Sequence, residues 1–227
     1  MSKPTLLNAT AARASTRVER LRQGSAARRT RGKVALKQQI LEAAIKMFEA
    51  KGYEAFSLRQ VAEEIGYSPT AIYLHFKDKD ALLLTVALEG FREFGEALQG
   101  AYSQHRRATP RLNAIGKAYV RFGLSHPLQY RLMFMQRGEF LSQDPPEGYD
   151  GVIDSFGVLL RAIQEGMDAG EIVRRDSREF AGLLWSAAHG VVSLSIGTPY
   201  LPASEAEGLF AWHMRILARE FEASRET

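Results

Sequence analysis

The segment FSLRQVAEEIGYSPTAIYLHF, residues 56–76, constrains the fold of this chain most, because it encodes the starts of two short helices in close succession. Ser57 followed by Gln60 forms a capping box, which marks the first turn of a helix. Ser68 is a favoured N-cap and Pro69 suits the first helical position, so a second helix begins there. Two short helices joined by a tight turn predict a helix-turn-helix unit.

The faces of these two helices suit binding to DNA. The apolar stripe of the first helix consists of Leu58, Val61, Ala62 and Ile65. Ile72 and Phe76 are expected to hold the second helix on the same inner side, so that its other face points outward. The second helix has no acidic side chain that would repel phosphate. Thr70 and Ala71, near its start, are small enough for close approach to base edges in a major groove.

Polar side chains around the second helix are expected to contact phosphates and so to position the protein without reading sequence. The candidate DNA-binding residues of this unit are Ser57, Arg59, Ser68, Pro69, Thr70, Ala71, Tyr73, Leu74, His75 and Lys79. The alternative is a plain helical hairpin inside a globular bundle, because short helix pairs are common in proteins of any function.

Basic side chains are concentrated at the start of the chain. Residues 1–80 carry 15 Lys and Arg against 8 Asp and Glu, although the net charge of all 227 residues is only +4. Residues 1–32 show no apolar periodicity and are expected to form a flexible arm. This arm could contact DNA, remain a passive tail, or serve as a transit peptide. We favour DNA contacts from the side chains nearest the first helix, which are Arg28, Arg29, Arg31 and Lys33.

The rest of the chain also shows helical spacing, and no alternating segment has the length of a strand. Helices are expected from near Lys33 to Gly52, from Asp78 to about Tyr102, from Thr109 to Leu124, from Ser125 through LQYRLMFMQ, from about Asp150 to Ala169, from Asp176 to about Ile196, and from Ser204 to about Ala223. This pattern predicts an all-α protein of about nine helices.

Several classes of protein are excluded or disfavoured. The chain has no cysteine, which excludes disulfides and cysteine-ligated metal sites and fits a reducing compartment such as the cytoplasm. No run approaches the length of uncharged apolar residues that a membrane span needs, and the N-terminus lacks the apolar region of a secretory signal. No phosphate-binding loop, GxSxG or HExxH motif occurs, and the histidines are scattered. We therefore expect no enzyme, no cofactor, no metal and no membrane partner.

The last two helices carry more apolar surface than a small bundle needs. FAGLLWSAAHGVVSLSI is apolar nearly all round, which indicates burial on more than one side. We expect these helices to pair with their copies in a four-helix homodimer interface. Its candidate residues are Leu183, Ala187, Val191, Phe210, Met214, Leu217 and Phe221. The alternative is that they form the core of a monomer.

Large apolar side chains on the helices after residue 80 could enclose a small-molecule pocket, with a few polar anchors among them. The candidate pocket residues are Tyr119, Phe122, His126, Tyr130, Met133, Phe134, Phe156, Trp185 and His189. Aromatic stripes at helical spacing are more often plain core, and His189 fits a hydrogen-bonded core histidine equally well. Nothing in the sequence identifies a ligand.

The residues from about 36 to 86, with the run ILEAAIKMFEAKGYEAFSLRQVAEEIGYSPTAIYLHFKDKDALL, resemble the DNA-binding head of the tetracycline-repressor (TetR) family of bacterial transcriptional regulators. The C-terminal part resembles the family more loosely. SHPLQYRLMF and WSAAHG are similar to a subset whose ligand domain carries a Trp-x-x-x-His-Gly motif, matched here by Trp185, His189 and Gly190.

The resemblance implies a homodimeric regulator, usually a repressor, whose two recognition helices enter successive major grooves of a palindromic double-stranded operator. A small-molecule effector bound in the C-terminal domain would release the DNA. The expected organisation is an arm at 1–32, a three-helix DNA-binding domain at 33–79 and a helical ligand-binding and dimerisation domain at 80–227. The competing function is a helical small-molecule carrier whose basic head binds nucleic acid without sequence preference.

Overall fold

The computed structural model of the chain describes residues 6–55, 57–135, 146, 149 and 154–221, with side chains from Ala27 onward except those of Tyr53 and Glu54. Within these residues the chain forms nine α-helices, one π-helical turn and no β-strand, which confirms the all-α prediction. The chain divides into two compact units, Met1–Lys79 and Asp80–Thr227, which we call the head and the body.

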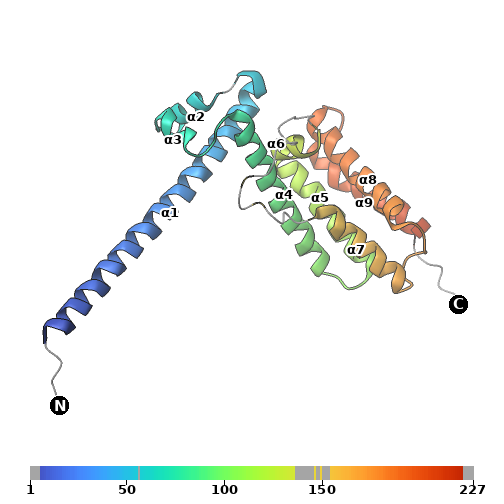
Figure 1. The fold of residues 1–227 in the computed structure, drawn as a ribbon. Helices are drawn as coiled ribbons and strands as arrows, with labels where there is room; N and C mark the ends of the chain where they lie inside the picture. Colours follow the sequence, from blue (N-terminus) through green and yellow to red (C-terminus); the bar gives the residue numbers. More distant parts are fainter. Residues whose placement is uncertain (1–5, 56, 136–145, 147–148, 150–153, 222–227) are drawn as a thin grey trace, which may run out of the picture. The chain divides into compact units, whose positions relative to one another are not determined.

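The head consists of three helices, α1 (Leu6–Ala55), α2 (Leu58–Glu64) and α3 (Pro69–Tyr73) (Figure 1). Its apolar core is contributed by all three helices and by Phe76, three residues after the end of α3. The buried side chains include Ile40, Leu41, Ala44, Met47, Phe48, Leu58, Val61, Ala62, Ile72 and Phe76. The inward side chains expected for the helix-turn-helix are therefore buried, apart from Ile65, which is half-buried.

Helix α1 is longer than the sequence pattern predicts. The expected start lies near Lys33, whereas the observed helix begins at Leu6. Residues 6–32 are rich in Ala and Arg, which favour the helix without forming an apolar face. A search for apolar periodicity therefore misses this part. The expected end is confirmed, because Gly52 has a φ of 75° and breaks the helical backbone there.

Side-chain caps define the two short helices of the head. The Gln60 amide N–H donates to Ser57 Oγ at 3.4 Å, and the Ser57 amide N–H donates to Gln60 Oε1 at 3.0 Å. Ser68 Oγ accepts from the Ala71 amide at 3.3 Å, with Pro69 in the first turn. Between them Gly66 adopts a φ of 72°, which lets the chain reverse. Both predicted N-caps are thus confirmed.

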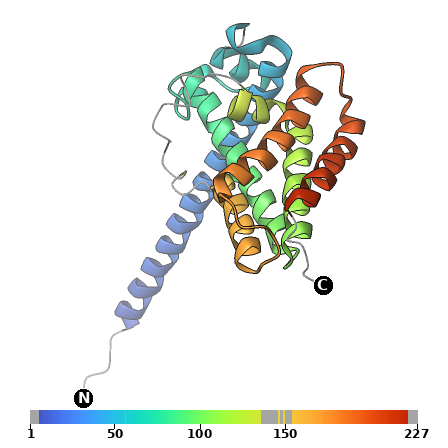
Figure 2. The ribbon, with the colours of Figure 1, turned by 90° about the vertical axis from the view of Figure 1, so that its right-hand side faces the viewer.

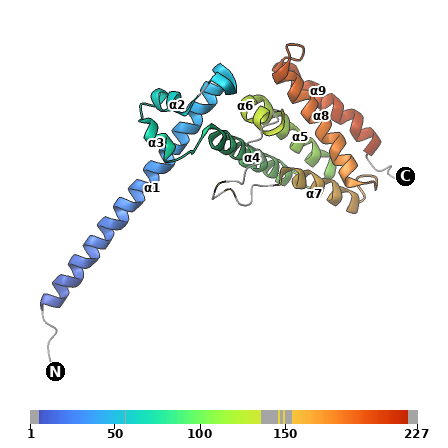
Figure 3. The same ribbon diagram turned by 45° about the horizontal axis from the view of Figure 1, so that its top comes forward.

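The body is built around α5. Its elements are α4 (Lys79–Ser103), α5 (Ala108–Ser125), α6 (Pro127–Tyr130), the π-turn η1 (Arg131–Met135), α7 (Ser155–Asp168), α8 (Ser177–Gly197) and α9 (Ala203–Phe221). Helix α5 packs against α7, α8 and α9, and α8 and α9 lie side by side (Figures 2 and 3). The aromatic ring of Phe94 from α4 packs on Tyr119 and Phe122 of α5.

Two helix boundaries differ from the predicted ones. The helix expected from about Asp150 begins at Ser155, because the Asp154 carboxylate caps it by accepting from the Gly157 amide at 2.9 Å; residues 150–153 lie outside the described part. The helix expected through LQYRLMFMQ is a single α-helical turn that passes into the π-turn, up to Met135.

Helix α8 corrects one expectation about composition. By length and composition alone, Ser177–Gly197 is long and apolar enough to cross a membrane, the one such helix among the described residues. From the sequence we expect no run of this kind, and α8 corrects that expectation. In the structure, α8 packs against α5, α7 and α9, which is the arrangement of a core helix in a bundle.

The contact between α5 and α9 yields a prediction. A Cβ atom added at Gly116 of α5 would lie 2.7 Å from Phe210 Cε1 and closer still to Cζ. We expect Gly116→Ala to lower the free energy of unfolding by about 1–3 kcal/mol through overpacking, measured by urea denaturation. Gly100→Ala in α4 is the control, because no atom lies near its added Cβ; it should leave stability unchanged or raise it by up to about 1 kcal/mol. Equal effects at both positions would contradict the packing argument.

Candidate nucleic-acid interface and ligand cavity

The outward side of the helix-turn-helix consists of the side chains predicted to contact DNA. Tyr73 is 50% exposed and Leu74 is 82% exposed, a large value for leucine in a folded unit. The other exposed candidates are Ser57, Arg59, Ser68, Pro69 and Thr70, and the half-buried ones are Ala71, His75 and Lys79. The face is thus accessible along the whole of α3.

The serines at the two helix starts keep a hydrogen-bond donor after capping. Ser57 and Ser68 each use the hydroxyl oxygen as an acceptor for a backbone amide of the following turn. The hydroxyl hydrogen of each remains able to donate, for example to a phosphate oxygen. Helix α3 also carries no acidic side chain. The surface therefore offers donors without a competing negative charge on the same helix.

Helix α1 contributes positive charge beside α3. Burial lowers the pKa of His75, and the nearby ammonium groups of Lys33 and Lys37 lower it further. The imidazole is therefore neutral near pH 7 and donates one N–H rather than a full charge. Lys37 was not among the predicted residues, although it lies one helical turn after Lys33. Arg28, Arg29 and Arg31 are exposed on the same helix, in its extension before the head core.

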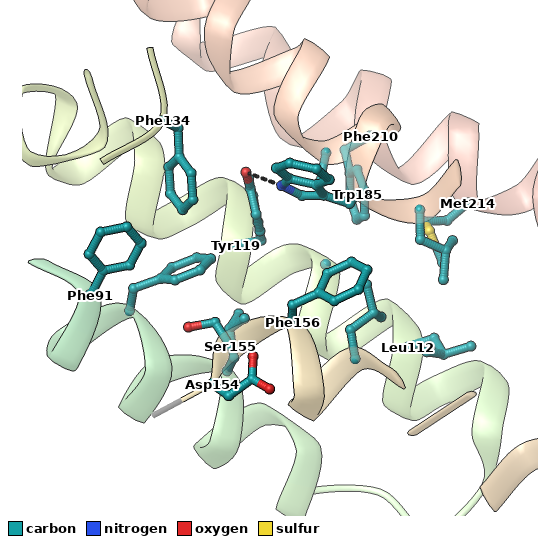
Figure 4. A pocket seen from close by; sticks show the side chains of 16 residues that line it. Phe91, Leu112, Tyr119, Phe134, Asp154, Ser155, Phe156, Trp185, Phe210 and Met214 are labelled. Carbon is teal, nitrogen blue, oxygen red and sulfur yellow. Dashed lines mark hydrogen bonds between the residues drawn. The ribbon is translucent and has the colours of Figure 1, made fainter. Parts of the chain in front are cut away.

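The body encloses a cavity of about 410 Å³, a size found for small-molecule sites (Figure 4). Four of the predicted pocket residues line it, namely Tyr119, Phe134, Phe156 and Trp185. The lining residues that sequence reasoning did not select are Phe91, Phe94, Leu98, Leu112, Gly116, Asp154, Ser155, Leu159, Leu184, Ala188, Phe210 and Met214. Phe91, Phe94 and Leu98 recur at helical spacing along α4, and this stripe could have predicted that α4 lines the cavity.

A chain of hydrogen bonds borders the cavity at Tyr119. Trp185 Nε1–H donates to the Tyr119 hydroxyl at 3.0 Å, as Figure 4 shows, and that hydroxyl lies 2.8 Å from Tyr130 Oη. Tyr130 Oη is 2.6 Å from His189 Nδ1, whereas Tyr119 Oη is 3.3 Å from it. Burial raises the pKa of Tyr119 to about 12, raises that of Tyr130 as well, and lowers that of His189, so all three are neutral near pH 7.

Each member of this network lies within hydrogen-bond distance of the next. A neutral imidazole has one ring nitrogen that accepts and one that donates, so the tautomer of His189 sets the donor between Nδ1 and the Tyr130 hydroxyl. Either hydroxyl can donate in the Tyr119–Tyr130 bond, whereas the Trp185 indole N–H donates to Tyr119. This arrangement links α5, α6 and α8 at one end of the cavity.

Five predicted pocket residues do not line the cavity. Tyr130 and His189 lie behind Tyr119 in the hydrogen-bond chain, and Met133 packs against α4 at Gly90. Phe122 and His126 stack on each other and line a separate polar groove between α4 and α5. The helical period shows that a side chain faces the core, and it does not show which part of the core is hollow.

The predicted dimer-interface residues separate into inner and outer ones. Val191, Phe210 and Met214 are buried inside the body, the last two against the cavity, which corrects their assignment to a surface between chains. Phe221 packs edge-on against Phe180, with ring centroids 3.8 Å apart. Leu183 is exposed, and Ala187, Leu217 and Phe221 are half-buried.

A different apolar surface of α8 and α9 faces outward. Trp212 is 54% exposed and Ile216 is 44% exposed on α9, while Leu183 and Leu194 of α8 are each about half exposed. On α8, Leu183, Ala187, Gly190 and Leu194 follow one another at helical spacing. We call the surface formed by Leu183, Ala187, Gly190, Leu194, Trp212 and Ile216 the outer α8–α9 face.

Both units match known families. Residues 40–86 match the family described as "Bacterial regulatory proteins, tetR family", and residues 112–217 match "Tetracyclin repressor-like, C-terminal domain". Over 49 residues the chain is 45% identical to the uncharacterized HTH-type transcriptional regulator YerO of Bacillus subtilis (strain 168). That match spans 22% of this chain and only 17% of YerO.

Solved structures extend the similarity to most of the chain. A bacterial regulatory protein of the tetR family from Rhodococcus RHA1 is 27% identical, with a TM-score of 0.66 over 83% of this chain and 97% of that one. A protein of unknown function from Rhodococcus sp. RHA1 is 28% identical, with a TM-score of 0.70 over 83% and 96% of the two chains. The ketosteroid transcriptional regulator KstR2 of Mycobacterium tuberculosis, 18% identical over 82% and 94%, shares the fold with a TM-score of 0.61.

The half-buried His189 predicts a pH dependence of stability. The usual pKa of histidine, near 6.5, applies to the unfolded chain, whereas burial lowers the pKa of His189 in the folded body. As the pH falls below the usual histidine pKa near 6.5, the unfolded chain takes up a proton before the folded chain does, so the free energy of unfolding decreases. His189→Asn, which offers an uncharged acceptor, should make this decrease smaller between about pH 7.5 and pH 5.5 in chemical denaturation. His105→Asn, outside the network, is the control. Superimposable pH curves for wild type and His189→Asn would contradict this assignment.

Proposed function

The chain belongs to the tetR family of bacterial regulatory proteins, and from this membership we propose that it is a homodimeric repressor that a small molecule releases from its operator. It is a DNA-binding transcriptional regulator, and membership of a regulator family agrees with the prediction that it is not an enzyme. The observation that carries the proposal is the presence, in one chain, of an exposed acid-free α3 and an aromatic cavity of ligand size.

We assign the reading of DNA to the N-terminal half of α3. Thr70 is exposed and Ala71 half-buried in the first turn, where small side chains allow the helix to approach base edges and thymine methyl groups. Tyr73, His75, the capping serines and the lysines near His75 serve as phosphate contacts, which position the head. Arg28, Arg29 and Arg31 extend this positive surface along α1.

The cavity supplies a physical route from effector to head. Phe91, Phe94 and Leu98 of α4 line it, and α4 begins at Lys79, the last residue of the head. A Cβ at Gly90 would lie 3.0 Å from Gln129 Cβ, so α4 and α6 are in close contact there. A ligand that moves the α4 aromatic rings therefore acts on the helix that continues directly into the head.

The outer α8–α9 face is the proposed dimer interface. Exposed tryptophan, isoleucine and leucine on adjacent helices form an apolar surface that a second copy would cover. A dimer of two identical heads matches a palindromic operator with half-sites about one turn of DNA apart. The proposed location of this activity is the cytoplasm, where such regulators meet DNA.

Selection of random duplex DNA by the purified protein tests the function directly. We expect an enriched palindrome, and Tyr73→Phe should then weaken operator and unrelated DNA alike by about tenfold, because a hydrogen bond to a charged phosphate is lost. Thr70→Ala should weaken the operator by about fivefold and relax the preference at one position of each half-site. Fluorescence anisotropy with labelled duplexes measures both effects.

Controls distinguish this function from its rival. Tyr200→Phe, at a fully accessible tyrosine of the body, should leave DNA affinity unchanged. Log affinity falls with log salt concentration in proportion to the number of phosphates contacted. If the arm contacts phosphates, replacing Arg28, Arg29 and Arg31 by alanine should make this slope shallower by up to about 3. Retention of DNA without any enriched motif would refute the operator and favour a carrier with a non-specific basic head.

The dimer interface has its own test. Trp212→Glu places a charge in the centre of the outer α8–α9 face, so we expect a monomer at micromolar concentration in sedimentation equilibrium, where wild type is a dimer. Val34→Glu adds the same charge at an exposed apolar residue of α1 and should leave the dimer intact. A dimer that survives Trp212→Glu would place the interface elsewhere.

A further inference from the structure

Aromatic rings dominate the lining of the cavity in the part of the chain that the structure describes. Aromatic side chains from α4, α5, η1, α7, α8 and α9 surround it (Figure 4). Among the described lining residues none is Lys, Arg or His, and the one carboxylate is that of Asp154. A ligand carboxylate or phosphate would lose its hydration here without gaining a positive partner, and Asp154 would repel it.

The Tyr119 hydroxyl at the edge of the cavity is engaged by neighbouring side chains. It lies 2.8 Å from Tyr130 Oη, which lies 2.6 Å from His189 Nδ1. Its oxygen accepts the Trp185 indole N–H. A polar ligand group at Tyr119 therefore competes with these side chains for the hydroxyl.

Asp154 supplies a carboxylate to the cavity lining and is held in place by its role as the N-cap of α7. Its Oδ1 accepts from the Gly157 amide at 2.9 Å, and a carboxylate has further lone pairs that can accept from another donor. Asp154 is exposed, whereas Phe94, Leu98 and Phe210 on the lining are buried. The carboxylate therefore lies at the open side of a cavity whose interior is aromatic.

From this distribution we propose that the effector is a lipophilic aromatic cation, with its ring system among Phe91, Phe134, Phe156 and Trp185 and its protonated amine facing Asp154. The electron-rich faces of the rings attract a cation as well as stacking on a planar body. This inference rests on the proposed role of the cavity as the effector site and specifies the chemical class of that effector. It disfavours free carboxylates, phosphates and acyl thioesters that carry phosphate.

A matched series of probes tests the charge preference. N-phenyl-1-naphthylamine, a neutral dye that fluoresces in apolar sites, reports occupancy of the cavity. Competitors share one ring system and differ in the terminal group: 2-naphthylmethylamine is a cation, 2-naphthylmethanol is neutral and 2-naphthylacetate is an anion. We expect the amine to displace the dye at about fivefold lower concentration than the alcohol, and the acetate to be the weakest.

Two variants assign the preference to a residue. Asp154→Asn keeps an N-cap for α7 and removes the charge, so the amine should lose its advantage and bind within about twofold of the alcohol. Asp176→Asn makes the same change at the N-cap of α8, outside the cavity lining, and should retain the wild-type order. An acetate or alcohol that binds as tightly as the amine in wild type overturns the proposal, as does an amine advantage that survives Asp154→Asn.

The dye separates failure of this inference from failure of the effector site itself. Ala188→Leu fills part of the cavity from α8 and should weaken dye binding. Dye that does not bind, or that binds Ala188→Leu as well as wild type, overturns the cavity as the ligand site and the cation proposal with it. Dye that binds in the cavity but is displaced best by the acetate overturns the charge preference alone.

Discussion

The body depends on the environment of Tyr119 more than on any other single interaction. The ring of Tyr119 packs edge-on against Phe94 of α4 with centroids 5.1 Å apart, while its hydroxyl is hydrogen-bonded to Trp185 of α8 and Tyr130 of α6. A buried hydroxyl must have partners, and these partners lie on separate helices. The need to satisfy one phenol therefore fixes the register of α5 against two of its neighbours.

The cavity follows from the same packing. Rings from several helices meet where α5 contributes Gly116 and α8 contributes Ala188 beside their larger side chains, so bulky side chains surround a space that these small residues do not fill. The π-turn η1 contributes here, because Phe134 lines the cavity while Leu132 and Met133, the two residues before it, are buried. Such turns insert an extra residue into the helical repeat and are frequent at functional sites. The chemical result, among the described residues, is an aromatic cavity that contains a carboxylate and no cationic side chain.

The head is organised by local rules, and the sequence predicted it closely. Capping boxes, a proline in the first turn and a positive φ at glycine involve residues that are near neighbours in the chain, so their pattern is visible in the sequence. The predicted caps at Ser57 and Ser68 and the buried Ile72 and Phe76 are all observed. The extension of α1 to Leu6 was missed because intrinsic propensity leaves no periodic trace.

The body shows where sequence patterns stop being informative. The stripe of Phe210 and Met214 was correctly recognised as a buried face, and the prediction that a second chain buries it was wrong, because α5 and the cavity lining do so. The residues left for a partner, such as Trp212 and Ile216, lie two positions away on the same helix. Apolar residues that recur every 3.6 positions show which face of a helix is buried. They do not show which other segment or chain packs on that face.

By itself, the sequence determined the all-α class, the helix-turn-helix with its capped helices and outward α3 face, and the resemblance to a family that the comparisons then established. Only the tertiary structure decided which aromatic residues enclose a cavity, which side chains hydrogen-bond to Tyr119 and that Asp154 joins the rings in the cavity lining. Helix caps and amphipathic faces are encoded by neighbours along the chain. A cavity and its charge arise from side chains far apart in sequence, whose distances no local pattern contains.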